Sequence, residues 1–336
     1  MNISQETATN QQGHQGGLTA VPGVAVGHFT DPAHWTGCTV ILTDKPAPAG
    51  VDVRGGAPGT LGTDSLRPGN MAGYLNGLFI SGGSAFGLEA SFGVMRYLKE
   101  RNIGLVTAFG VVPKVAAAVI YDLGVNASDR PPGVEAGYAA CLNATKDPVV
   151  EGCVGAGTGA TVGKLAGREK GMKGGLGSAS ICTDYGLIVG ALAVVNSWGN
   201  IIEPGSGAIL AGARNNPTGG FIDPIALIKS QPPKSNLAFA NTTIGVVVTN
   251  AELDTTAMTV VAKMAHSGLA RAVNPCHTLF DGDAIFALSV GHQLVPDPNA
   301  VGILAAEAMV QAIISAVKHA SSAPGFPSWA EVHRAG

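Results

Sequence analysis

One run of β-branched residues constrains this chain most: Ile244-Gly245-Val246-Val247-Val248, which directly follows Asn241-Thr242-Thr243. Isoleucine and valine are stiff at χ1 and pack well on a pleated surface, so the run predicts a β-strand. Two hydroxyl side chains stand where this strand begins, immediately after an asparagine. Taken alone, these polar residues are most often turn residues that open a strand.

The same polar residues also permit a catalytic interpretation. If the bond between Asn241 and Thr242 is cut, Thr242 carries both a nucleophilic Oγ and a free α-amine. Such an amine has a reference pKa of about 7.7–8.0, so it can take the hydroxyl proton near neutral pH. Thr242 is therefore a candidate nucleophile, with self-cleavage at Asn241.

Composition indicates a globular protein with a small-molecule substrate. Of the 336 residues, 46% are hydrophobic and 13% charged, which is enough apolar material for one large domain or two smaller ones. The 48 glycines are about twice the usual share of roughly 7% and have no G-X-Y period, which indicates many tight turns. A net charge of −3 without a Lys/Arg cluster argues against a nucleic-acid partner.

Cysteine usage and hydropathy predict a cytoplasmic protein without a membrane partner. The five cysteines are widely spaced and form no C-x-x-C pair, which favours reduced thiols over a zinc site or disulfide framework. Residues 1–17 are polar, so we expect a disordered tail and no signal peptide. The longest apolar runs, such as Leu187–Val195, are too short to span a bilayer.

Apolar periodicity predicts an alternation of strands and helices, which is typical of an α/β protein. Strands are expected at 24–26, 39–42, 51–53, 78–80 and 187–195. Helices are expected at 88–100, 114–121, 136–144, 255–272 with Asp254 as its cap, and 299–319. A segment rich in Gly, Pro, Asn and Ser, 204–236, predicts a long exposed loop.

Two glycine-rich segments invite motif assignments that their sequences do not support. Around Ser84, the nucleophile elbow Gly-x-Ser-x-Gly requires glycine where Phe86 stands, so we interpret Ser84 as a helix cap or a pocket wall. Residues 155–164 contain a Gly-x-Gly-x-x-Ala, but no clear strand precedes it and no acidic residue follows about twenty positions on. A phosphate loop fails as well, because Thr158 replaces a required glycine and Leu165 a required Ser or Thr.

Four further polar residues are candidates for the site. Lys164, among small residues, is either a poorly hydrated lysine with a lowered pKa or an ordinary solvated one. Asn196 ends an apolar strand, where its amide can donate to an oxyanion or simply make a turn. Asp281 and Asp283 precede a buried strand and can orient a hydroxyl or an α-ammonium; a glycine turn and a partial cation site are the alternatives.

Together the motifs resemble the P1 peptidase family, which includes the L-aminopeptidase/D-esterase, β-peptidyl aminopeptidases and the nylon-oligomer hydrolase. The resemblance covers about residues 20–320. Its motifs are Val53–Thr60, Ser81–Leu88, Val119–Asp122, Gly155–Lys164, Asn241–Ile244 and His277–Asp283, in the family's order. In the aminopeptidase branch the nucleophile is serine and the later pair is serine with glutamate. Thr242, Asp281 and Asp283 follow the nylon-hydrolase pattern instead.

The resemblance implies a four-layer αββα sandwich of the N-terminal-nucleophile type. It implies a single domain over 18–336, cleaved between Asn241 and Thr242 into an α chain 1–241 and a β chain 242–336, and assembly into homotetramers of αβ units. The implied residue roles are nucleophile for Thr242, its assistant for Lys164, oxyanion donor for Asn196, positioning of Thr242 for Asp281 and Asp283, and substrate binding for Tyr121 and Ser84. No metal and no cofactor are implied.

The predicted function is therefore a self-processing N-terminal-threonine amidohydrolase or aminopeptidase. Its expected substrates are short peptides, amino-acid amides or esters, or 6-aminohexanoate oligomers, cleaved through an acyl-enzyme. Three alternatives stay open: an acyltransferase resembling ornithine acetyltransferase, a nucleotide-binding protein that uses residues 155–164, and a non-enzymatic assembly protein.

Overall fold

The computed structural model describes residues 16–125, 129–216, 219–230 and 241–334. Most of the predicted tail, residues 1–15, lies outside the described residues, and Gly17 already begins a short 3-10 helix, η1 (Gly17–Ala20). The division into one domain over 18–336 stays a prediction.

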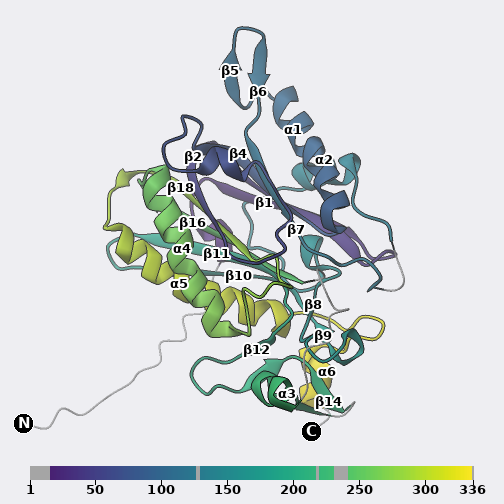
Figure 1. Cartoon of the computed structure of the whole chain (residues 1–336). Coiled ribbons are helices and arrows are strands. Elements are labelled where there is room, and N and C mark those ends of the chain that lie inside the picture. Colours follow the sequence, from purple (N-terminus) through teal and green to yellow (C-terminus); the bar gives the residue numbers. More distant parts are fainter. Residues whose placement is uncertain (1–15, 126–128, 217–218, 231–240, 335–336) are drawn as a thin grey trace, which may run out of the picture.

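The β-branched run forms β16 (Thr242–Ala251), which lies within a nine-stranded mixed sheet (Figure 1). β16 pairs antiparallel with β11 (Ile188–Asn196) and parallel with β18 (Ala284–Leu294). The other strands are β10 (Gly175–Cys182), β2 (Thr36–Val53), β4 (Tyr74–Ser81), β7 (Val115–Val119), β3 (Thr60–Leu61) and β1 (Val24–Asp31), which pairs with β2.

The 18-residue strand β2 connects two groups of strands. Its end, Ala49–Val53, pairs with β18, and its earlier part, from Cys38, pairs with β4. The register with β4 shifts between Leu42 and Ala47. The sequence predicts two separate strands here, at 39–42 and 51–53. That prediction is wrong, because both runs belong to this single strand.

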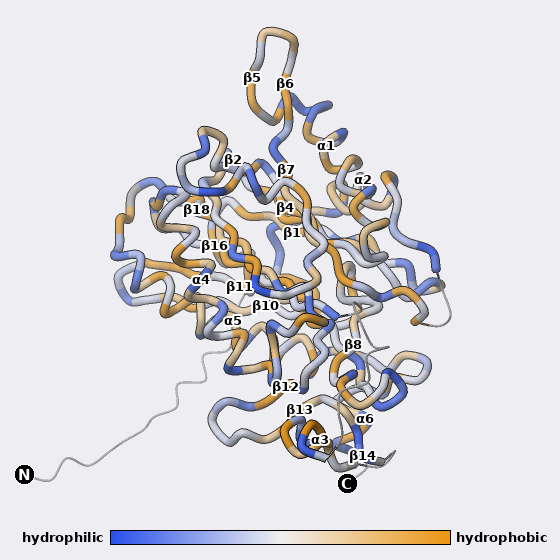
Figure 2. Tube along the Cα trace, viewed as in Figure 1, coloured by the Kyte–Doolittle hydropathy of each residue, from blue (hydrophilic) through white to orange (hydrophobic). Residues whose placement is uncertain are grey.

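Helices cover the strands on two sides, so the strands are buried on both faces. α4 (Thr255–Ala272) and α5 (Pro298–Lys318) pack in one apolar cluster with alternate residues of β11, β16 and β18, including Val247. The intervening residues, including Val246 and Phe286, belong to a second cluster shared with β2 and β4. α1 (Ser91–Glu100) and α2 (Val134–Leu142) pack on β4 and β7 in a third. Burial on both faces explains the orange stretches along the central strands in Figure 2.

α5 is long and apolar enough to cross a membrane by length and composition, but it serves as a core helix. Of its most apolar window, 56% is buried. It lies directly on β10, so close that a Cβ atom on Gly177 would come within 2.1 Å of the Ala312 carbonyl oxygen. Glycine at this position therefore permits the helix to approach the sheet.

Long, strongly patterned elements were predicted well. The expected strand at 187–195 and the helices at 136–144, 255–272 and 299–319 are confirmed as β11, α2, α4 and α5. Asp254 caps α4 as expected, since its carboxylate accepts a hydrogen bond of 2.8 Å from the Ala257 amide.

Two other predictions are wrong. The helix expected at 114–121 is the strand β7, because its valine and alanine side chains are all buried and pair with β4. The loop expected at 204–236 contains β13 (Ile209–Ala211), β14 (Arg214–Asn216), β15 (Gly219–Phe221) and α3 (Pro224–Ser230). Its last part, 231–236, lies outside the described residues.

The remaining elements are short. They are β5 (Leu105–Thr107), β6 (Gly110–Val112), β8 (Thr161–Val162), β9 (Met172–Lys173), β12 (Asn200–Ile202), β17 (Val273–Asn274), α6 (Trp329–Arg334), η2 (Thr63–Leu66), η3 (Ser84–Ala90), η5 (Gly155–Gly157) and η6 (Arg168–Lys170).

The close approach of α5 makes a stability prediction. We expect Gly177→Ala to destabilise the protein by about 1–3 kcal/mol, because the added methyl must displace the α5 backbone. Gly205→Ala is the matched control, since no atom lies within 4 Å of a Cβ built there. Thermal unfolding of the two variants checks this, and equal melting temperatures would contradict the packing described.

Candidate active site

Three strand ends converge at Thr242. In the antiparallel pairing of β11 with β16, the last pair is Asn196 with Thr242. On the other side, Asn241 forms a parallel bridge with Asp281, just ahead of β18. All four side chains are buried. Residues distant in sequence therefore meet around the Asn241–Thr242 peptide bond.

The carbonyl oxygen of Asn241 accepts two hydrogen bonds. One comes from the Oγ of Thr242 and the other, of 2.9 Å, from the backbone amide of Gly282. A Cβ atom on Gly282 would stand 2.8 Å from the Thr242 Oγ and 2.6 Å from the Ala57 carbonyl oxygen, so this position requires glycine. The carboxylates of the Asp-Gly-Asp segment were predicted from the sequence as site residues, but this amide was not. The glycine between the two acids was the available signal.

Lys164 lies against Asn196. Its Nζ donates to the main-chain oxygen of Asn196 at 3.1 Å and to its Oδ1 at 2.9 Å. Burial lowers the pKa of Lys164 well below its usual value, and the negative charge of Asp281 is the largest opposing influence. The prediction of a poorly hydrated lysine is confirmed, and the alternative of a solvated lysine is wrong.

Asn196 is oriented by the segment that ends in Lys164. Its Oδ1 also accepts a 3.0 Å hydrogen bond from the Thr161 amide, and its Nδ2 donates to the Tyr121 carbonyl oxygen at 3.1 Å. The amide oxygen of Asn196 thus faces Lys164 and Thr161, and its amide nitrogen faces Tyr121. The residue ends β11 beside Thr242 in an orientation fixed by these partners, and its role as an oxyanion donor stays a prediction.

The two aspartates contact different parts of the site. Asp281 accepts hydrogen bonds from the Trp198 amide, 3.1 Å, and the Thr278 hydroxyl, 2.5 Å. Burial, followed by the negative charge of Asp283, raises the pKa of Asp281 to about 6. Asp283 accepts a 2.7 Å bond from the amide of Thr243, the residue after the candidate nucleophile.

A glycine-rich segment, residues 54–57, holds both aspartates through their main chain. The amides of Arg54 and Gly55 donate to the Asp283 carbonyl oxygen at 2.9 and 3.1 Å, and the Ala57 amide donates to that of Asp281 at 2.9 Å. A Cβ atom on Gly55 would lie 2.3 Å from the Asp283 nitrogen, so the two backbones touch. This explains the Arg-Gly-Gly-Ala motif, to which sequence analysis gave no role.

Ser84 contacts the backbone one residue before Tyr121. The Ser84 amide donates to the carbonyl oxygen of Ile120, the neighbour of Tyr121, at 2.9 Å. Ser84 has a φ of 55° and is the first residue of η3, whose N-cap is Gly83 without a side-chain hydrogen bond. Its interpretation as a helix cap is therefore wrong. Substrate contact by Ser84 or Tyr121 stays a prediction.

A buried lysine that the sequence did not reveal supports the segment 155–164 from inside. The Nζ of Lys173, which is fully buried, donates to the carbonyl oxygens of Gly157, Ala160 and Gly174 at 3.1, 2.6 and 3.0 Å. A phosphate-binding loop instead turns its amides toward an open pocket. The arrangement thus lends no support to nucleotide binding by this segment.

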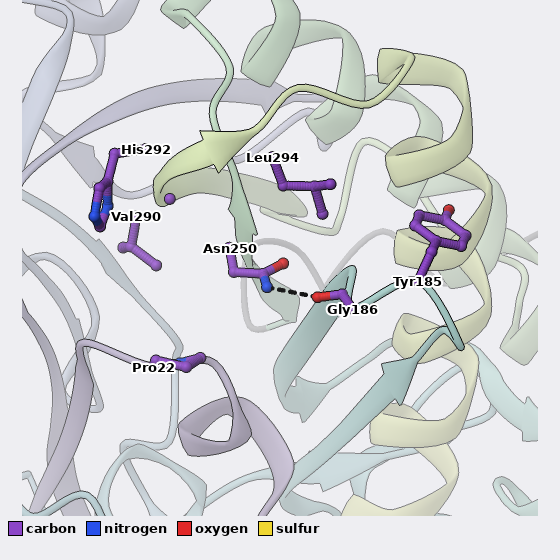
Figure 3. Close-up of a pocket in the computed structure, with 8 residues that line it drawn as sticks. Pro22, Tyr185, Gly186, Asn250, Val290, His292 and Leu294 are labelled. Carbon is purple, nitrogen blue, oxygen red and sulfur yellow. Dashed lines mark hydrogen bonds between the residues drawn. The ribbon is translucent and has the colours of Figure 1, made fainter.

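The cavity shown in Figure 3 lies away from this site, and the described residues include no cluster of metal ligands. Across the described ranges, no group of three or more His, Cys, Asp or Glu side chains is placed to hold a metal ion. A cavity of about 460 Å³ opens near Asn250, at the opposite end of β16 from Thr242. There the Asn250 side chain donates to the Gly186 carbonyl oxygen at 2.8 Å (Figure 3).

Comparison with known sequences supplies the family. The profile of peptidase family S58 matches residues 17–328. The chain belongs to peptidase family S58. An uncharacterised aminopeptidase of Mycobacterium bovis is 40% identical over 343 residues, which cover 94% of this chain and 97% of that protein. A 6-aminohexanoate-oligomer endohydrolase of Kocuria sp. is 30% identical, over 88% of this chain and 84% of the other.

Solved structures establish the fold class of this S58 protein. A β-aminopeptidase of Burkholderia sp. superimposes with a TM-score of 0.70 at 22% identity, covering 96% of this chain and 94% of the other. The L-aminopeptidase D-Ala-esterase/amidase of Ochrobactrum anthropi, described as a variant of the Ntn hydrolase fold, gives 0.67 at 21%, covering 92% and 88%. The fold is thus a mixed α/β fold like that of Ntn hydrolases. Membership of the peptidase family and the named sequence relatives make the protein a hydrolase acting on amide bonds.

The charge arrangement predicts that the pKa of Asp281 depends on its charged neighbours. Carbon-13 NMR of the Asp281 carboxyl should show a midpoint near pH 6, with the ionised form above it. Asp283→Asn should lower this pKa, because it removes the repelling charge, although burial keeps it above the usual 3.8. Lys164→Met should raise it, because it removes an attracting charge. An unchanged midpoint in both variants would contradict the proximity of these groups.

Proposed function

We propose that this S58 protein is a self-processing amidohydrolase or aminopeptidase whose nucleophile is Thr242. The observation that carries the proposal is the arrangement at Asn241, whose carbonyl oxygen contacts the Thr242 hydroxyl and the Gly282 amide. A hydroxyl on one side of a carbonyl and an N–H on its oxygen are the two components that acyl transfer requires.

In the first reaction the chain cleaves itself. The Oγ of Thr242 attacks the Asn241 carbonyl carbon, and the Gly282 amide stabilises the charge that develops on the oxygen. The C–N bond then breaks, the Thr242 nitrogen takes the proton, and an ester joins Asn241 to the Thr242 Oγ. Water hydrolyses this ester, which leaves a carboxylate on Asn241 and a free α-amine on Thr242.

In the second reaction the same hydroxyl attacks a substrate amide. The new α-amine takes the Oγ proton, an acyl-enzyme forms as the substrate amine leaves, and water releases the acid. Lys164, whose ammonium gives up its proton more readily because burial lowers its pKa, assists this proton transfer. Asn196 adds an oxyanion donor. Asp283 holds the amide of Thr243 beside the nucleophile, and Asp281 holds the amide of Trp198, two residues after Asn196.

The relatives suggest the substrate class. Those above 30% identity are named aminopeptidases, and a relative at 30% is named for 6-aminohexanoate oligomers. We therefore propose short peptides, amino-acid amides or esters, or linear amide oligomers as substrates, with Tyr121 and Ser84 in the binding wall.

The remaining expectations from the resemblance belong to the same proposal. The three apolar clusters support a four-layer αββα sandwich, with one cluster at each interface between layers. The chain then forms a single domain, assembles as a homotetramer of αβ units and works in the cytoplasm without a metal or cofactor.

Thr242→Ala tests the nucleophile directly. We expect it to leave the chain uncut and to lower kcat/KM on amino-acid p-nitroanilides and 6-aminohexanoate dimer by at least about 10³-fold, because no hydroxyl remains to attack. Intact mass and N-terminal sequencing should find a fragment beginning Thr242-Thr243-Ile244 in the wild type only.

Thr249→Ala is the matched control, since this threonine lies near the other end of β16. Its hydroxyl donates to the Ile188 carbonyl oxygen at 3.0 Å and accepts from the Ala251 amide at 3.1 Å. It should process like the wild type. A Thr242→Ala protein that still processed at Asn241 would overturn the proposal. A wild-type product that appeared only with an added amine acceptor would favour the acyltransferase alternative.

A further inference from the structure

We infer that His277 is a positioning residue of the Thr242 site, which holds Asp283 so that this carboxylate fixes the backbone beside the nucleophile. The inference rests on the proposed function and assigns a role to a residue that lies outside the sequence-predicted set. The hydrogen bonds of His277 go to Asp283, so it acts on the Thr242 site through this carboxylate.

His277 donates twice to one oxygen of Asp283. Its main-chain amide lies 2.8 Å and its Nδ1 2.9 Å from the Asp283 Oδ2. Because an ionised carboxylate only accepts hydrogen bonds, the ring proton belongs on Nδ1. The other oxygen, Oδ1, accepts the 2.7 Å bond from the Thr243 amide. Three donors therefore define the orientation of a carboxylate that is 1% exposed.

The contact with Thr243 matters because of where the strand pairing starts. The parallel register between β16 and β18 begins with Ile244 and Ala284. The Asp283 side chain extends this hydrogen bonding one residue toward Thr242, to the amide of the peptide bond that follows the nucleophile. Rotation of Asp283 would therefore release the backbone of Thr242 on this side.

The conformation of His277 is itself unusual. Its φ is 56°, in the left-handed region that residues other than glycine rarely adopt. In this conformation both its main-chain and ring N–H groups reach the same carboxylate oxygen. Backbone strain of this kind gathers at functional sites, and here it is coupled to a specific contact.

A second histidine packs against the ring of His277. His266 of α4 is fully buried, and its ring meets that of His277 edge to face, with centroids 4.8 Å apart at 74°. Its Nε2 contacts the Asp52 main-chain oxygen at 3.0 Å, so this nitrogen carries the proton. Burial lowers the pKa of His266 to about 4, which keeps the ring uncharged near neutral pH. The charged groups around the pair are Asp52, Arg54 and Asp283.

Two substitutions distinguish the contribution of the His277 ring from that of its main-chain amide. His277→Gly keeps the left-handed backbone and its amide but removes the ring donor. His277→Asn also tolerates this backbone and returns an N–H donor close to the position of Nδ1. We expect His277→Gly to slow self-cleavage and lower kcat by about 10²-fold with KM within about twofold, and His277→Asn to recover most of that loss.

His34→Gly is the matched control. His34 also donates twice to one aspartate, with its amide 3.1 Å and its Nδ1 2.8 Å from the carboxylate oxygens of Asp31, but this pair lies in the turn between β1 and β2. The full-length proteins are compared for the rate of self-cleavage, for kcat and KM on an amino-acid p-nitroanilide, and for melting temperature. His34→Gly should process and hydrolyse like the wild type.

Two results would overturn the role of His277. One is wild-type processing and kcat in His277→Gly. The other is an equal loss in His277→Gly and His277→Asn, because a restored N–H donor would then not matter. Failure of the proposed function looks different: in that case Thr242→Ala retains activity whatever the His277 variants do.

Discussion

Segments that are distant in the sequence pack together around the carbonyl oxygen of Asn241. It receives the Thr242 hydroxyl from its own strand and the Gly282 amide from the segment ahead of β18. The close approach is possible because Gly282 has no side chain and because residues 54–57 hold the neighbouring aspartates through their main chain. Long strands, tight glycine contacts and the end of β2 therefore all contribute to one carbonyl environment.

Buried charge is the second constraint, and the structure meets it with hydrogen bonds. Lys164 and Asp281 are both removed from water, which opposes their charged forms, and each has named polar partners. Lys173 satisfies its ammonium with three main-chain oxygens behind the site. In surroundings of low dielectric, each fixed dipole acts more strongly on a developing charge than it would in water. The polar groups that cost free energy to bury are therefore the same groups that serve the proposed chemistry.

Sequence patterns predicted the elements that depend on local periodicity. β16, β11, α4 and α5 have long apolar patterns and clear end signals, and the structure confirms them. The alanine-rich segment that forms β7 was predicted as a helix, because propensity alone favours helix and only pairing with β4 decides otherwise. The site divides in the same way. Thr242, Asn196, Lys164 and the two aspartates have chemistry visible in the sequence, whereas Lys173 and His277 acquire their environment only when distant segments pack together.

We propose that self-cleavage and hydrolysis pass through the same kind of intermediate, an ester on the Thr242 hydroxyl. This shared chemistry links the fold to its substrate range. The ester formed during processing has the α chain as its acyl group, so chemically it is an acyl-enzyme whose acyl residue is Asn241. Any group that stabilises the Asn241 carbonyl in the uncut chain therefore faces the substrate carbonyl afterwards, the Gly282 amide included. A change to the reacting centre alters both reactions together. On this proposal, we expect aminopeptidases and oligomer hydrolases of the family to differ in the walls around the reacting centre, because the centre itself must first accept the chain's own peptide bond.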